Sequence, residues 1–246
     1  PTRTRRQRQM CIRDSINTDR SVCARLAGEI AQRHGNRGFE GQLDLTFRGA
    51  AGQSFGALLV QGLNVRLEGE ANDYVGKCMN SGRIILVPAD ATANPGDQVI
   101  LGNTCLYGAT GGELFAHGRA GERFGVRNSG ARTVVEGAGD HCCEYMTGGV
   151  VVVLGSTGRN VGAGMTGGVT FLLDEGDRVT PRVNPEIVEV CCITTPEQES
   201  TLKGLLEKHL AVTGSIKAAS LLADWATAIL QFKVLIPPSE RAVSYT

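Results

Sequence analysis

Three glycines could bind a nucleotide. Gly162, Gly164 and Gly167 give residues 162–167 the spacing GxGxxG. In a dinucleotide-binding fold this spacing places a pyrophosphate at the N-terminus of the helix that follows. Here the next residues are VTFLL, which is a strand pattern. We therefore expect residues 162–167 to form a corner between strands, and nucleotide binding is the weaker alternative.

A second candidate is the run His141, Cys142 and Cys143, which contains the groups of a thiolate–imidazole pair or a metal site. Adjacent residues in a strand point to opposite faces, so these side chains would not converge. The eight cysteines include no CxxC pair, and their spacing fits neither a zinc site nor an iron–sulfur cluster. We interpret them as reduced core residues of an intracellular protein.

The remaining polar candidates are scattered. Glu68, Glu70 and Asp73 precede Tyr74, and a hydrogen-bonded or solvated loop explains them better than a site does. Three isolated histidines are expected at helix ends or on the surface: His34, His117 and His209. The sequence has no GxSxG motif and no phosphate-binding GxxxxGK[ST] motif. We therefore predict no catalytic, cofactor-binding or metal-binding residue in this chain.

Composition excludes further classes of protein. Lys plus Arg and Asp plus Glu number 25 each, so the net charge is zero, which argues against binding to nucleic acid. No apolar run approaches the roughly 18 residues that cross a bilayer. Hydrophobic residues make up 41% of the chain, which is enough for a core.

Glycine marks the elements that would position all of these residues. Five stretches share a small polar residue, a glycine and an apolar run rich in β-formers: residues 80–87, 110–116, 128–135, 147–154 and 166–173. Their anchoring glycines are Gly82, Gly112, Gly130, Gly149 and Gly168. They are separated by 30, 18, 19 and 19 residues, and the first gap contains an insertion at residues 89–98. A period near 19 residues indicates stacked repeats that bury their apolar faces against each other. We expect glycine at corners with positive φ, because a Cβ is costly there.

The predicted fold is mainly β: a parallel β-helix over about residues 41–190, with helical flanks. Residues 18–34 read as a helix capped by Thr18 or Asp19. Residues 196–211 and 215–230 read as two further helices, with Thr195 and Ser215 as caps. These two helices would pack on the β-helix or cover its open end.

The first 15 residues stand apart because they are rich in arginine and lack an apolar period. They fit a transit peptide, a basic tail or, as we favour, a disordered or non-native extension. Residues 16–246 would then form the domain itself.

Several blocks resemble one family closely. They are AGQSFGA (51–57), GEANDYVGK (69–77), GNTCLYGATGG (102–112), GRAGERFGVRNSG (118–130), GDHCCEYMTGG (139–149), NVGAGMTGG (160–168) and RVNPEIVEV (182–190). The sequence from about residue 16 to residue 240 is similar to the C-terminal glycine-repeat domain of the glutamate synthase large subunit. The resemblance implies that the predicted parallel β-helix is right-handed. Cys23 and Cys78 stand where that family usually has glycine, which puts the local backbone in doubt at both points.

The resemblance implies a function for a whole enzyme and a structural role for this part. Glutamate synthase makes glutamate from glutamine and 2-oxoglutarate by reductive ammonia transfer. It uses FMN, an iron–sulfur cluster and electrons from ferredoxin or a nicotinamide cofactor. The resemblance implies that this segment holds the glutaminase and FMN-barrel domains in register, in the cytoplasm or a plastid stroma. The alternative is a free-standing β-helix that docks partner chains.

Overall fold

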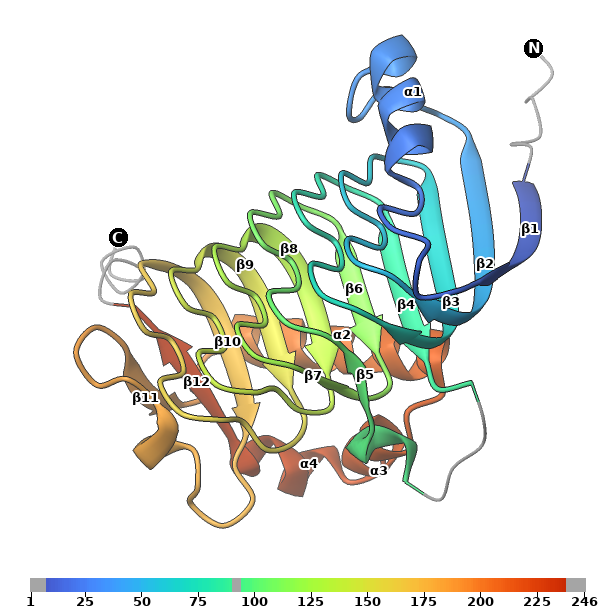
Figure 1. Cartoon of the computed structure of the whole chain (residues 1–246). Helices are drawn as coiled ribbons and strands as arrows, with labels where there is room; N and C mark the ends of the chain where they lie inside the picture. The colour runs from blue at the N-terminus through green and yellow to red at the C-terminus, as the bar shows by residue number, and fades with distance from the viewer. Residues whose placement is uncertain (1–7, 90–93, 238–246) are drawn as a thin grey trace, which may run out of the picture.

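The computed structural model describes residues 8–89 and 94–237. The first seven residues of the predicted extension, and residues 238–246 of the predicted domain, lie outside this range. The described part is a parallel β-solenoid of about six turns with a few helices. Figure 1 shows its strands side by side from β1 to β10, with one zigzag edge of corners. The predicted fold class, mainly β with a parallel β-helix, is confirmed.

One sheet path runs through the described residues in the order β1-β2-β3-β4-β6-β8-β9-β10-β12-β11. Neighbours are parallel as far as β10, and β12 is antiparallel to both β10 and β11. The strands of the path are β1 (Arg8–Ser15), β2 (Gln42–Ala51), β3 (Leu63–Ala71), β4 (Arg83–Val87), β6 (Glu113–Ala116), β8 (Ser129–Val135), β9 (Thr147–Val153), β10 (Gly167–Leu173), β11 (Glu189–Cys192) and β12 (Phe232–Ile236). Two short strands lie off this path, β5 (Val99–Leu101) and β7 (Arg119–Ala120).

The helices and 3-10 turns are α1 (Ala24–His34), η1 (Pro95–Asp97), η2 (Thr180–Arg182), α2 (Pro196–Thr213), α3 (Ile216–Ala223), α4 (Trp225–Ala228) and η3 (Ile229–Gln231). Thr195 caps α2 in a reciprocal capping box with Gln198. Gly214 ends α2 at a φ of 73°, and Ser215 caps α3.

The later strands are apolar on both faces because two cores meet at the sheet. Val151 and Val153 of β9 point into the solenoid, whereas Val152 between them packs in a second core outside it. Residues of α2 and α3, including Leu202, belong to that second core. This double burial explains the continuous apolar runs of the repeats.

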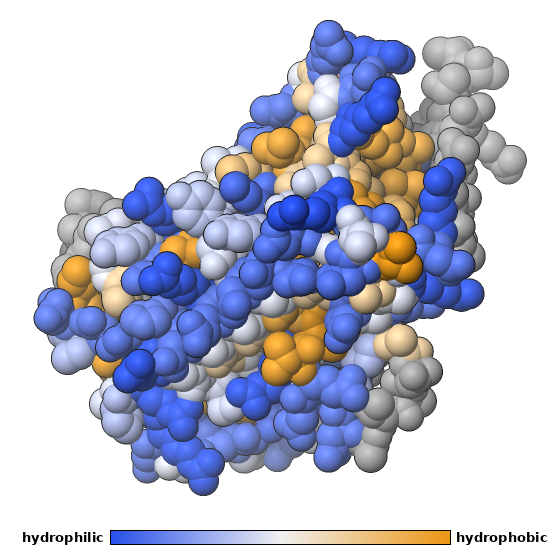
Figure 2. Space-filling view, viewed as in Figure 1, coloured by the Kyte–Doolittle hydropathy of each residue, from blue (hydrophilic) through white to orange (hydrophobic). Residues whose placement is uncertain are grey.

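The first turn of the solenoid is less well covered than the turns that follow. Leu43 and Phe47 of β2 are only partly buried, whereas Leu63 and Leu67 on the next strand are fully buried. An apolar groove of about 630 Å³ lies between β2 and α1, where Leu26 contributes to its lining. Figure 2 shows a largely hydrophilic face on which apolar side chains gather beside α1. Helix α1 therefore covers this end of the solenoid only in part.

The C-terminal helices cover the side of the solenoid. Helix α2 packs across β4, β6 and β8 (Figure 1). Of the two placements considered from the sequence, packing on the β-helix is the one observed for α2. The segment expected as a helix over residues 215–230 is divided into α3, α4 and η3, because Asp224 leaves the helical region with φ −126° and ψ 64°.

The N-terminal flank differs from expectation in two places. Helix α1 begins at Ala24, six residues later than expected, after Cys23 at a φ of 72°. Arg8–Ser15 forms strand β1, paired in parallel with β2, where we expected a disordered or non-native extension. Whether this segment is native stays a prediction.

The predicted corner glycines form one ladder with an exception. Gly82, Gly112, Gly149 and Gly168 have φ between 80° and 89°. Gly130 does not have positive φ; instead, a Cβ there would collide with the Thr110 carbonyl. Glycine is therefore required at position 130 because a side chain would not fit there, and not because the backbone has positive φ.

The turn of Gly130 contains a bulge. The register shifts between Ser129 and Arg132, so Ala131 replaces glycine in the ladder. The Asn128 side chain accepts the backbone N–H of Ala131 at 2.9 Å and donates to the Ala131 carbonyl at 3.0 Å. These two hydrogen bonds hold the turn where the glycine is missing.

A second stack of corners breaks the expected rule that glycine occupies positive φ. In each turn this corner contains three left-handed residues at alternate positions, for example Tyr74, Gly76 and Cys78. Most of these positions are not glycine: Ser54, Leu58, Tyr74, Cys78, Thr104, Leu106, Arg123, Arg127, His141, Cys143, Tyr145 and Asn160. All of these residues except Asn160 donate their N–H groups to carbonyls of neighbouring turns, as Cys78 does to Tyr107 at 2.8 Å. These bonds between turns offset the roughly 1–2 kcal/mol cost of each left-handed side chain.

Candidate functional site

The GxGxxG stretch lies in this second corner stack. Gly162 and Gly164 have φ of 73° and 66°, and Gly167 begins strand β10. The Gly162 N–H donates to the Cys142 carbonyl of the preceding turn at 2.9 Å. No helix follows the motif directly, since β10 comes next, so it lacks the helix N-terminus that holds a pyrophosphate in dinucleotide-binding folds.

The histidine–cysteine run lies in the preceding turn of the same stack. Cys142 and Cys143 are both fully buried, with their Sγ atoms 3.7 Å apart. The expectation of opposite faces fails because these residues lie in a corner and not in a strand. The hydrogen bond with Cys143, followed by burial, raises the pKa of the Cys142 thiol well above its ordinary value. The His141 Nδ1 atom lies 3.9 Å from Glu144 Oε1. The run therefore contains a protonated thiol rather than a thiolate.

The acidic candidates do not converge on one point. Glu68 pairs with Arg48 at 2.9 Å and with Arg66 at 3.4 Å across the outer face of the sheet. The hydrogen bond from Arg48 is the main cause that lowers the pKa of Glu68, against a smaller effect of burial. Asp73 accepts the backbone N–H of Asn103 at 2.7 Å. Both carboxylates are engaged in contacts that join one turn of the solenoid to another.

The most concentrated polar group is a cluster that sequence analysis missed. It consists of Glu136, His117, His209 and Ser215, all buried, and we call it the Glu136 junction. Glu136 Oε1 lies 3.3 Å from His209 Nε2 and 3.9 Å from His117 Nε2. Ser215 donates its hydroxyl to the same oxygen. The prediction of a surface or helix-end position is wrong for His117, which is buried and directly follows a strand. His209 is also buried, although it lies in the last part of α2.

The protonation states follow from these contacts. Burial by itself raises the pKa of Glu136, but hydrogen bonds from His209 and Ser215 outweigh it and hold that pKa below 4.5. Burial lowers the pKa of His209 below 6.5, and the nearby Glu136 carboxylate opposes this only in part. At neutral pH an ionised carboxylate therefore accepts a hydrogen bond from a neutral imidazole at Nε2.

The Glu136 junction connects elements that are far apart in sequence. His117 and Glu136 follow β6 and β8 directly, so they meet at the carboxyl ends of parallel strands. His209 is near the end of α2, and Ser215 caps α3 through the Ala218 N–H at 3.0 Å. Breaking such a buried network costs about 1–3 kcal/mol for each polar group left unpaired. The geometry therefore fixes both helices to the solenoid.

An open polar cavity adjoins the Glu136 junction. Its volume is about 520 Å³, and His117, Arg119, Glu136 and Lys217 contribute to its lining. Ser215, the hydroxyl that contacts Glu136, is fully buried and donates to that carboxylate, so it is not poised as a nucleophile. No group of three or more His, Cys, Asp or Glu side chains within residues 8–89 and 94–237 could hold a metal ion. In the same ranges, no helix is long and apolar enough to span a membrane.

One signal in the sequence could have revealed the Glu136 junction. His117 and Glu136 occupy the same place in successive repeats, immediately after the strands ELFA and RTVV. Aligning the repeats on their strands would have brought these two residues together. His209 and Ser215 carry no such signal because they lie outside the repeats.

Known proteins match almost the whole chain. The family model described as the GXGXG motif covers residues 3–238. A chloroplastic ferredoxin-dependent glutamate synthase of Spinacia oleracea is 58% identical over 229 residues, which is 92% of this chain and 14% of that relative. A ferredoxin-dependent glutamate synthase 2 of Synechocystis sp. is 57% identical over 227 residues, covering 92% of this chain and 15% of the relative.

The chain thus spans about 14–15% of the length of the relatives it matches. The family match covers more than nine tenths of the sequence, including every repeat of the solenoid. It also confirms the resemblance that the glycine-containing blocks indicated. The chain therefore belongs to the GXGXG family, and over 92% of its length it is similar to part of ferredoxin-dependent glutamate synthases.

Proposed function

We propose that this chain is the C-terminal structural domain of a glutamate synthase and that it contains no catalytic centre. The parent enzyme would make glutamate from glutamine and 2-oxoglutarate with FMN and an iron–sulfur cluster in other domains. The names of the relatives favour ferredoxin as the electron donor. The chloroplastic relatives favour a plastid stroma, with the cytoplasm as the alternative.

The main support for this proposal is that the candidate polar groups make contacts within the fold. Glu68, Asp73 and Glu136 each contact another turn or a covering helix. The candidate thiol of Cys142 is buried and protonated. Residues engaged in such contacts stiffen a body, and a stiff body suits the holding of a glutaminase and an FMN barrel in register.

The test uses full-length glutamate synthase carrying Gly149→Ala, which weakens the solenoid, with Gly204→Ala in α2 as the matched control. Three activities are measured against temperature: glutamine hydrolysis, ammonia-dependent glutamate synthesis and glutamine-dependent glutamate synthesis. We expect Gly149→Ala to lower the temperature at which glutamine-dependent synthesis fails, because this activity needs both domains in register. The two partial reactions should persist above that temperature.

The opposite result is a partial reaction lost at 25 °C while circular dichroism shows the domain folded. That result would mean that the solenoid supplies groups to a catalytic centre, and the proposal of a purely structural domain would be abandoned.

A further inference from the structure

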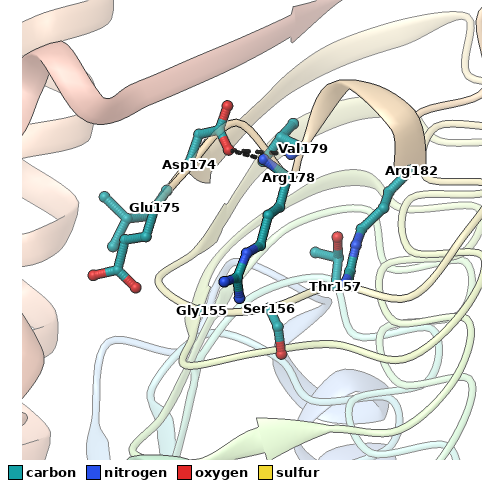
Figure 3. A pocket seen from close by; sticks show the side chains of 9 residues that line it. Gly155, Ser156, Thr157, Asp174, Glu175, Arg178, Val179 and Arg182 are labelled. Atoms are coloured by element: carbon teal, nitrogen blue, oxygen red, sulfur yellow. Dashed lines mark hydrogen bonds between the residues drawn. The ribbon is translucent and has the colours of Figure 1, made fainter.

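A small pocket lies where two turns of the solenoid end. The loop after β9 supplies Gly155, Ser156 and Thr157, and the segment after β10 supplies Asp174 and Glu175. Arg178, Val179 and Arg182 complete the lining, as Figure 3 shows. Its volume is about 70 Å³. This volume is well above the roughly 10–15 Å³ that a single water needs, so the pocket has room for a compact ion.

The backbone that carries the two arginines is fixed. The Asp174 Oδ1 atom accepts the N–H of Arg178 at 2.7 Å and that of Val179 at 3.1 Å. The turn η2 then continues, with the Arg182 N–H donating to the Val179 carbonyl at 2.9 Å. In Figure 3 both arginine side chains extend from this turn toward the loop of residues 155–157. The two guanidinium groups are thus presented to one recess by a capped turn.

Within residues 8–89 and 94–237, neither guanidinium group makes an ion pair or a side-chain hydrogen bond. Some arginines elsewhere on the solenoid are paired: Arg48 with Glu68, Arg83 with Glu113, and Arg159 with Asp140. Another, Arg119, has a buried Nε atom without a hydrogen-bond partner among the described residues. Two carboxylates also line the pocket, and neither pairs with these arginines. Glu175 pairs with Lys217, and Asp174 caps the turn through Oδ1, whereas its Oδ2 atom is buried without a hydrogen-bond partner among the described residues. Among the described residues, these two arginines therefore have no counter-charge of their own.

The loop that forms the floor lies tight against the preceding turn. A Cβ at Gly155 would collide with the Glu136 carbonyl, and a Cβ at Gly158 would collide with Asp140. Thr157 between them is only 5% exposed. In Figure 3 the Thr157 hydroxyl lies beside the Arg182 side chain. A hydroxyl donor in a fixed loop complements two guanidinium groups in binding an oxyanion.

We propose that this pocket binds a small oxyanion, a phosphate or a carboxylate group, between Arg178 and Arg182, with Thr157 as a third donor. Guanidinium forks match the oxygen spacing of both groups, and charge-assisted bonds of this kind are about twice as strong as neutral ones. The site is separate from the Glu136 junction and does not depend on the scaffold role.

Isothermal titration of the 246-residue chain with sodium phosphate, and separately with sodium succinate, tests the proposal. Ionic strength is held constant with sodium chloride, which also serves as the control titrant. We expect saturable binding of at least one of the two anions. Arg178→Gln and Arg182→Gln should each raise Kd at least about tenfold, because each removes a charge-assisted contact. Arg159→Gln, which removes an equal charge from the adjoining loop, should change Kd by less than about twofold.

Saturation with phosphate alone would assign the site to a tetrahedral anion, and saturation with succinate alone to a carboxylate. Absence of saturable binding of either anion in the millimolar range would overturn the proposal. So would binding that survives both glutamine variants with an unchanged Kd. Each variant is first checked for an unchanged melting temperature without anion, so that loss of binding cannot be loss of fold.

Discussion

A series of three glycine substitutions separates the two reasons why this fold needs glycine. Gly204 lies inside α2 with ordinary φ, and no neighbouring atom lies within 4 Å of the position that a Cβ would take. Gly108 has a φ of 63°, and a Cβ there would meet only Cys78 Sγ at 3.6 Å. Gly149 has a φ of 85°, and its Cβ would collide with the Ala131 carbonyl and lie 2.8 Å from Asn128 Nδ2. Alanine is therefore unstrained at the first site, strained at the second, and both strained and overpacked at the third.

The expected free energies follow from these three environments. Gly204→Ala should stabilise the chain by about 0.5–1 kcal/mol, because alanine is the better helix former. Gly108→Ala should destabilise by about 1 kcal/mol, the cost of a left-handed side chain less the entropy removed from the unfolded chain. Gly149→Ala should cost about 2–4 kcal/mol, since overpacking adds a further 1–3 kcal/mol. The larger Gly149→Val should destabilise more strongly still.

Urea unfolding followed by circular dichroism measures the series, provided that the slope of free energy against urea is the same in all variants. The informative quantity is the order of the three midpoints. If Gly149→Ala unfolds at the same urea concentration as Gly108→Ala, the close approach to Ala131 carries no energy and our account of the corner ladder fails. If Gly108→Ala is as stable as Gly204→Ala, positive φ costs nothing in the second stack.

Three further outcomes are expected. The melting temperature should fall between pH 7 and pH 5, because burial lowers the pKa of His209 and the unfolded chain takes up the proton more readily than the folded chain. His209→Gln should flatten this dependence, and an unchanged slope would count against it. Thr195→Ala should cost about 1 kcal/mol in urea unfolding by removing the capping box of α2, whereas Thr195→Ser should cost little; equal losses would contradict the cap. In a thiol-reagent assay the exposed Cys192 should react in the native chain, and the buried thiols should react only after unfolding. The reason is that burial raises the pKa of thiols such as Cys105, whose pKa rises to about 12. Fast labelling of the buried thiols in the native chain would refute this. The buried set is Cys105, Cys142 and Cys143.

The solenoid was predictable because glycines recur at a regular spacing in its repeats. The period near 19 residues placed the strands that end in Ala116, Val135, Val153 and Leu173. It could not place the bulge at Ala131, because the sequence NSGA satisfies the same glycine pattern with one extra residue. A shift of one residue is invisible when both residues are small.

The second stack of corners was not predictable by the same rule. Tyr74, Cys78 and Tyr145 are left-handed although each has a Cβ. The energy that allows this comes from hydrogen bonds to neighbouring turns, which no local pattern records. Cys23 and Cys78, where the resembling family usually has glycine, have φ of 72° and 54°. The two positions where the sequence departs from the usual glycine are therefore left-handed in this chain.

The location of polar groups follows from the burial of the strands. The strands that α2 and α3 cover have apolar side chains inside the solenoid and outside it, so buried polar residues such as Glu136 gather just beyond the strand ends. Parallel strands bring those ends to one edge, where Glu136 follows β8 and Asp174 follows β10, two levels further along. At Glu136 the covering helices supply the partners, His209 and Ser215. Beside Asp174, no helix supplies a partner for the Arg178 guanidinium among the described residues. The architecture that satisfies Glu136 therefore leaves a cationic recess two levels beyond it, where the anion that we propose would supply the missing counter-charge.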